Sequence, residues 1–161
     1  MRKEIVWVFG TSAAGKETFI RTAATNPIHR SNLGWQGKKI TFCKESIKNL
    51  VTIENDPRNT HRDTIISNVE ELIKTNDVVL IKWQFLDSDS ERVRQLKNNL
   101  QNFSHKIIIL NASDSEISNR LIKKDWWKPE YCQKDWIENE RELLRKDLEQ
   151  YRDFEIIQME S

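Results

Sequence analysis

The stretch EIVWVFGTSAAGKETFIRTAA, residues 4–24, constrains the fold of this chain more than any other segment. Residues 4–9 are nearly all apolar, which is typical of a strand that is buried on both faces. Residues 15–25 place Phe19 and Ile20, and an alanine pair one turn later, on one side of a helix. The segment therefore predicts a strand, a glycine-bounded loop and a helix, the first unit of an α/β domain.

The loop between these two elements has the spacing of a phosphate-binding loop, G-x-x-x-x-G-K-[ST], except for a glutamate at the last position. Glycine lets the backbone turn so that successive N–H groups face a phosphate, and the following helix points its positive end at the same anion. The lysine adds a mobile positive charge. A plain strand-to-helix turn is the alternative, but the chain has only four glycines and two of them lie here. We expect a nucleoside triphosphate to bind this loop through Gly10, Thr11, Ser12, Ala13, Ala14, Gly15, Lys16, Glu17 and Thr18.

The rest of the chain alternates apolar runs with helical patterns. Further strands are expected at 38–43, 77–83, 105–112 and 154–159, and further helices at 60–75, 89–102, 113–124 and 135–151. The residues SDSE, 113–116, have the capping-box pattern and predict that Ser113 caps the third of these helices. Around the weakest segment, 26–59, the stretches NPIHRSNLGWQGKK (26–39) and ENDPRNTHRD (54–63) look like loops. Strands that alternate with helices predict a parallel sheet covered by helices on both faces. A length of 161 residues favours a single domain, residues 1–161, with its own core.

Composition limits the partners of this chain. Apolar residues make up 37% and charged residues 32%, and the net charge is +1, which argues against a duplex nucleic acid partner. No apolar run approaches the roughly 20 residues of a membrane span. Cys43 and Cys132 are isolated, and the amino-terminal residues form a strand rather than a signal peptide, so we expect a cytoplasmic protein.

With these features in place, the sequence resembles the P-loop kinases of nucleotides and small metabolites. The run GTSAAGKET is similar to the loop of adenylate kinases, which ends G-K-G-T, and to that of ribose bisphosphate kinases, which ends G-K-D-[ST]. In that register Thr18 matches the threonine that holds the α-phosphate. The resemblance implies a three-layer α/β fold with a five-stranded parallel sheet in the order 2-3-1-4-5. It also implies ATP as the phosphate donor, with Mg²⁺.

A second resemblance lies in IIILNASDSEISNRLIKK, which begins in the fourth expected strand. Gluconate and shikimate kinases carry a similar strand and helix, followed by R-L-x-x-R at the entry of a lid. Arg120 matches the arginine that lies over the adenine and the phosphates, and Lys124 stands in place of the second arginine. The resemblance implies a lid over about residues 120–135; the alternative is a basic helix end favoured by the helix dipole. Trp126 and Trp127 would either stack on a base or, as we favour, pack the lid onto the domain.

The magnesium position departs from the pattern of this family. Glu17 occupies the place of the loop hydroxyl, and Lys82 or Gln84 occupies the place of the acid that ends the third strand. Some family members, such as shikimate kinases, also lack an acid at this strand end and use one after the second strand. Three arrangements are open for Glu17: an ion pair with Lys82 in the usual magnesium site, direct contact with Mg²⁺, or exposure to solvent. We favour the ion pair.

The segment TIENDPRNTHRD, residues 52–63, is the candidate for the acceptor side. Phosphoryl transfer needs positioning, charge neutralisation and often a carboxylate that accepts the hydroxyl proton. Asp56 or Glu54 would orient or deprotonate the acceptor, and Arg58 or Arg62 would bind its anionic group. The alternative is an Asx-Pro turn that leads into a helix.

Together these features predict an ATP-dependent kinase that transfers the γ-phosphate to a small metabolite or a nucleotide. Lys16, Arg120 and Asp56 are the expected catalytic residues. The first alternative is a nucleotide-binding protein with weak or no transfer activity that acts as a regulator. The second is a kinase that acts on nucleic acid, which the near-neutral net charge disfavours.

Overall fold

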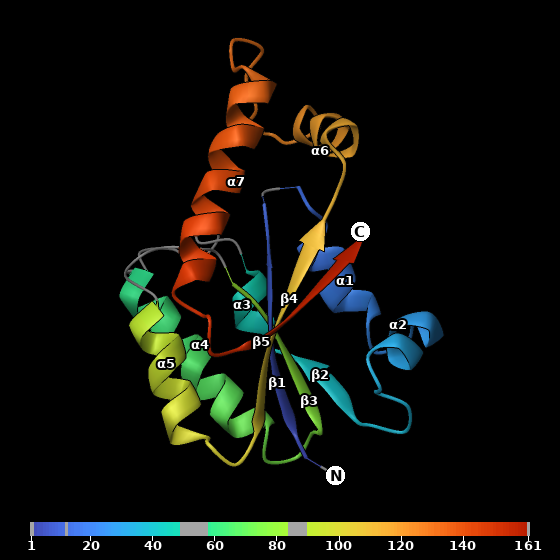
Figure 1. The fold of residues 1–161 in the computed structure, drawn as a ribbon, viewed down its shortest axis with the longest axis vertical. Helices are drawn as coiled ribbons and strands as arrows, with labels where there is room; N and C mark the ends of the chain where they lie inside the picture. Colours follow the sequence, from blue (N-terminus) through green and yellow to red (C-terminus); the bar gives the residue numbers. More distant parts are fainter. Residues whose placement is uncertain (1, 12, 49–57, 84–89, 161) are drawn as a thin grey trace.

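The computed structural model describes residues 2–11, 13–48, 58–83 and 90–160. Within these ranges one sheet contains β1 (Glu4–Gly10), β2 (Ile40–Phe42), β3 (Val78–Lys82), β4 (Ser104–Asn111) and β5 (Glu155–Glu160). The strands are parallel and lie in the order β2-β3-β1-β4-β5, which confirms the predicted topology (Figure 1). Since β1 lies at the centre of this order, the loop that follows it lies at the middle of the carboxyl edge of the sheet.

Helices cover both faces of the sheet. They are α1 (Lys16–Thr22), α2 (Pro27–Asn32), α3 (Lys44–Ile47), α4 (Arg58–Leu72), α5 (Ser90–Asn99), α6 (Asp114–Leu121) and α7 (Gln133–Glu149). Figure 1 shows α1 and α2 on one side of the sheet and α4, α5 and α7 on the other. No helix in the described ranges is both long enough and apolar enough to cross a membrane.

The central strand β1 is buried along its whole length, and its side chains alternate between the two faces. Trp7 and Phe9 belong to the core under α4 and α5, where Trp7 meets the Trp83 ring edge-on at 5.0 Å. Val6 and Val8 belong to the core under α1. Each side chain buried in this way stabilises the fold by roughly 1.5–3 kcal/mol, so the position of the loop after β1 is fixed by packing on both sides.

The expectation of loops is wrong for the short helix α2 and for the start of α4 at Arg58, and the short helix α3 was not predicted. Asn26 accepts hydrogen bonds from the backbone N–H groups of Ile28 and His29 and so caps α2, whose first residue is Pro27. The second short helix, α3, follows Cys43. The sequence Asn-Pro was a signal for a helix start as well as for a turn, and the helix prevails because both capping bonds form.

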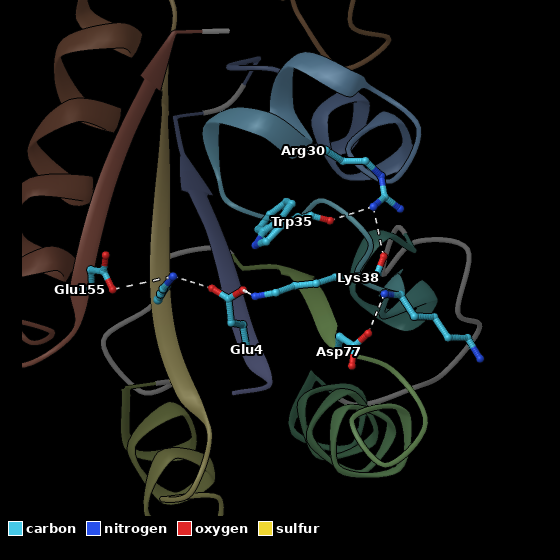
Figure 2. A network of polar contacts seen from close by, with 8 residues as sticks. Glu4, Arg30, Trp35, Lys38, Asp77 and Glu155 are labelled. Carbon is cyan, nitrogen blue, oxygen red and sulfur yellow. Dashed lines mark hydrogen bonds and ion pairs between the residues drawn. The ribbon is translucent and has the colours of Figure 1, made fainter. Parts of the chain in front are cut away.

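A network of charged groups closes the amino edge of the sheet (Figure 2). The carboxylate of Glu4, which is 3% exposed, lies 2.8 Å from the Lys38 ammonium and 2.5 Å from the Lys106 ammonium. Lys106 also lies 3.9 Å from Glu155. Arg30 donates to the carbonyl of Lys38 at 3.1 Å, so the network joins β1, β4 and β5 to the segment after α2. This network fixes the amino end of the sheet, which lies opposite the glycine loop.

Candidate phosphate-binding site

The loop between β1 and α1 is held by close packing and by two unusual backbone conformations. Gly15 has a φ of 92°, in the left-handed region that glycine adopts without strain. Ala13 has a φ of 65°, which costs a residue with a Cβ some strain. A Cβ added at Gly10 would lie 3.1 Å from the Ala14 Cβ and 3.2 Å from the Leu110 carbonyl oxygen. Both glycines of the motif are therefore required by the shape of the loop.

Lys16 opens α1 and folds back over the loop. Its ammonium donates to the carbonyl of Gly10 at 2.8 Å and to the carbonyl of Thr11 at 3.0 Å, and the residue is only 7% exposed. The carbonyls are neutral acceptors, so they satisfy the hydrogen bonds of the ammonium without compensating its charge.

The electrostatic surroundings of this ammonium disfavour its charged form. Burial, together with the smaller effects of the Lys82 and Lys124 charges, lowers the pKa of Lys16 from 10.5 to about 7, although Glu140 of α7 acts in the opposite direction. A bound anion would reverse this effect, because it would stabilise the ammonium. Glu140 was not identified from the sequence, where it is one of many glutamates on a charged helix and carries no motif.

Lys82 lies at the carboxyl end of β3, in register with Val8 of β1. Val78 and Leu80 belong to the core under α1, and alternation along a strand puts Lys82 on the same face. Burial lowers the pKa of Lys82, and the positive charges of Lys124 and Arg62 lower it further, whereas Glu17 raises it. Lys82 thus brings a second, half-buried ammonium toward the start of α1.

The predicted ion pair between Glu17 and Lys82 is wrong. The Glu17 carboxylate accepts from the Arg21 guanidinium at 3.0 Å and 3.2 Å, one helical turn along α1. No ion pair within 4.0 Å joins Glu17 to Lys82 among the described residues, although the field of Glu17 reaches Lys82. Arg21 lies four residues after Glu17 on the same helix, where the two side chains are neighbours, whereas Lys82 lies on a different element. The carboxylate of Glu17 therefore pairs with Arg21.

Arg120 reaches the loop from α6. Its guanidinium donates to the carbonyl of Ala13 at 2.9 Å and lies 3.5 Å from Glu116 one turn earlier. Ser113 caps α6 by accepting from the backbone N–H of Glu116, as the sequence predicted. The helix is therefore anchored with Arg120 over the loop and not on the far face of the sheet; the role of this arginine toward ATP stays a prediction.

The tryptophans after α6 pack against one another and against a small core of α6 and α7. Trp127 and Trp136 are partly buried against this core of Ile117, Leu121 and Ile137, and Ala13 of the loop packs against the same core. The Trp126 ring lies 5.1 Å from the Trp136 ring, and Trp126 is 46% exposed. This arrangement supports packing for Trp127, while base stacking by the exposed face of Trp126 stays a prediction.

The candidate acceptor residues are only partly within the described structure. Glu54 and Asp56 lie outside the described residues, and of Arg58 only the backbone, at the start of α4, is described. Arg62, one turn later, is buried, with its guanidinium 4.6 Å from the centre of the Trp83 ring. Since Trp83 directly follows β3, Arg62 lies near the carboxyl end of that strand, and its charge acts on Lys82.

The described residues do not fit the Mg²⁺ that the fold class implies. Mg²⁺ prefers oxygen ligands, but β3 ends in Lys82, and the Glu17 carboxylate is paired with Arg21. Across the described part of the chain, no group of three or more His, Cys, Asp or Glu side chains could hold a metal ion. Gln84, the other residue considered for this position, lies outside the described ranges.

Solved structures with the same fold are kinases and related proteins. The chain aligns over 98% of its length with 85% of shikimate kinase from Bacteroides thetaiotaomicron, at 14% identity and a TM-score of 0.57. It aligns over 99% with 82% of a gluconokinase from Sinorhizobium meliloti 1021, at 13% identity and a TM-score of 0.52. The tunicamycin resistance protein of Deinococcus radiodurans is aligned over 86% of its chain, at 17% identity and a TM-score of 0.60. These likenesses establish that the chain has the P-loop kinase fold.

Comparison at the level of sequence gave no relative. No model of a known protein family and no curated protein matches the chain.

Proposed function

We propose that this protein binds ATP at the loop from Gly10 to Thr18 and transfers its γ-phosphate to a small metabolite or a nucleotide. The observation that carries the proposal is Lys16, a buried ammonium whose hydrogen bonds go to the neutral carbonyls of the loop. Keeping such a group costs stability. A triphosphate in the loop would supply negative charge directly at this ammonium, and the P-loop kinase fold makes that ligand the natural one.

The cations around the loop suit a reaction that needs positioning and charge stabilisation more than covalent chemistry. Lys16 would leave the carbonyls of the loop and hold the terminal phosphates, and Thr18 would contact the α-phosphate. Arg120 and Lys124, on a lid of about residues 120–135, would stabilise the charge that develops on the transferring phosphoryl group. ATP would bind within a single domain that comprises residues 1–161.

The acceptor would bind where β3 and α4 approach the loop. Arg62, with Arg58, would hold an anionic group of the acceptor, and Asp56 or Glu54 would orient its hydroxyl or accept the proton. Two of the structural neighbours are named as kinases of small metabolites, shikimate kinase and gluconokinase. A small anionic metabolite is therefore our first choice of acceptor, in a cytoplasmic setting.

One observation favours a second function, nucleotide binding with weak or no transfer. The two positions that hold magnesium in related kinases carry Glu17, paired with Arg21, and Lys82. Such a protein would act as a regulator through its bound nucleotide. A kinase that acts on nucleic acid is the third candidate, and the net charge of +1 gives it no support.

Transfer of labelled phosphate distinguishes these functions. The protein is incubated with ATP labelled at the γ-phosphate and with separate pools of hydroxy acids, sugars and nucleotides, and labelled products are separated by chromatography. We expect a labelled product with wild-type protein and none with Lys16→Ala. ATP binding without any labelled product would favour the regulatory function, and equal product from Lys16→Ala would contradict the proposal.

A further inference from the structure

Four positive side chains from four different elements influence one another at the carboxyl edge of the sheet. The charges of Lys82 and Lys124 act on Lys16, and those of Lys124 and Arg62 act on Lys82. They come from the start of α1, the end of β3, the residues after α6, and α4. Like charges repel, so this arrangement disfavours the empty site and favours an anion with several negative charges.

Lys82 is the member of this group that the ordinary phosphate loop does not explain. Lys16 belongs to the loop motif, whereas Lys82 ends the strand at which many related kinases carry an acid. It continues the row of Val78 and Leu80 on the face that α1 covers, and its neighbour in register on β1 is Val8, two residues before Gly10. The row therefore ends with an ammonium beside the residues that should receive the phosphates.

Glu17, the acid whose charge raises the pKa of Lys82, does not form an ion pair with it. Glu17 acts on Lys82 only through its field, since its carboxylate accepts hydrogen bonds from Nε and Nη2 of Arg21. Within the described part of the chain, the charge of Lys82 is thus available to a ligand. A divalent cation placed beside it would be repelled, whereas a phosphate oxygen would be attracted.

We infer that Lys82 supplies, as part of the protein, the positive charge that Mg²⁺ brings to ATP in related kinases, so that the site binds the metal-free triphosphate. This inference rests on the proposed function, because it concerns the same phosphate site. An ammonium is a compact charge with three donors, which suits it to contact oxygens of two neighbouring phosphates.

Calorimetric titration with ATP tests the inference under two conditions, with EDTA and with excess Mg²⁺. We expect the wild-type protein to bind ATP in EDTA at least as tightly as in Mg²⁺. Lys82→Gln, which keeps most of the aliphatic stem, should weaken binding in EDTA at least tenfold, whereas Lys82→Arg should weaken it less than threefold. Inorganic triphosphate should bind the wild type, Lys82→Arg and Lys82→Gln with the same order of affinities. This result would exclude an effect of the base.

A matched control removes the same charge far from the site. Lys74 lies in the turn between α4 and β3, at the amino end of the sheet, where it is exposed and paired with Glu71. Lys74→Gln should leave the affinity for ATP in EDTA within twofold of that of the wild type. Equal losses in Lys82→Gln and Lys74→Gln would overturn the inference, because only the net charge would then matter.

The wild-type protein decides the inference even if Lys82→Gln does not fold. Binding in Mg²⁺ together with no binding in EDTA would overturn it and leave the phosphate site in place, with metal ligands provided by other residues. No binding of ATP under either condition would overturn both this inference and the proposed function.

Discussion

Replacing Lys16 by methionine should make the protein more stable and abolish ATP binding. The pKa of Lys16 lies at about 7 in the folded protein, against an ordinary value of 10.5. At 1.36 kcal/mol per unit, this difference corresponds to roughly 5 kcal/mol of unfavourable free energy for the buried ammonium. Methionine, however, leaves the two loop carbonyls without this donor, which costs roughly 3 kcal/mol. Lys16→Met should therefore raise the free energy of unfolding by about 1–2 kcal/mol at pH 6.5.

The advantage of this variant should depend on pH in a definite direction. Between pH 7 and 10.5 the unfolded chain binds a proton at Lys16 that the folded protein does not, so the stability of the wild type rises with pH in this window. The gain of Lys16→Met should thus be largest below pH 7 and shrink toward pH 10. Saturating ATP should reverse the order, because a ligand at a hundredfold its Kd stabilises the wild type by about 2.7 kcal/mol.

Urea denaturation at pH 6.5 and pH 9, with and without ATP, measures these differences. Lys74→Met is the control for the added methionine, since Lys74 is exposed and remote from the loop. If Lys16→Met were less stable than the wild type at pH 6.5, or if its gain were the same at both pH values, then the buried ammonium would not carry the cost argued above.

Two further predictions concern the lid and the opposite end of the sheet. Arg120→Ala should lower the rate of phosphoryl transfer by about tenfold or more while ATP affinity changes less than about threefold, because the charge of Arg120 acts mainly on the transferring group. Steady-state kinetics measures the rate, and calorimetry measures the affinity. An equal loss of rate and affinity would refute the lid assignment. Glu4→Gln should cost about 2 kcal/mol of stability, since it leaves the Lys38 and Lys106 ammoniums without their shared carboxylate. Urea denaturation measures this loss, and an unchanged midpoint would show that the network of Figure 2 contributes nothing.

The sequence predicted those parts of the fold that depend on local patterns. The apolar run of β1, the two glycines around the loop and the cap of α6 at Ser113 follow from residue types and spacing, and the structure contains all three. The helix α2 was missed because Asn26-Pro27 also suits a turn, and only the two capping bonds distinguish the helix.

The details of the site depend on which of several possible partners each charged side chain contacts, and the sequence pattern does not reveal this. The alternation along β3 places Lys82 on the face of α1, but whether Glu17 pairs with it depends on Arg21, which offers a closer partner on the same helix. Glu140 comes near Lys16 only because α7 runs back toward the loop. Such contacts arise from tertiary packing between distant segments, so spacing along the chain does not predict them.

The backbone N–H groups of the loop provide the most direct test of the central claim, that a triphosphate binds between β1 and α1. In an ATP titration followed by amide nuclear magnetic resonance of ¹⁵N-labelled protein, we expect the largest shifts at Gly15, Lys16, Glu17 and Thr18, with 1:1 saturation. Lys16→Ala should lose these shifts. Saturable shifts confined to another region, such as the hollow beside Arg2 at the amino edge of the sheet, or the absence of any shift, would contradict the account.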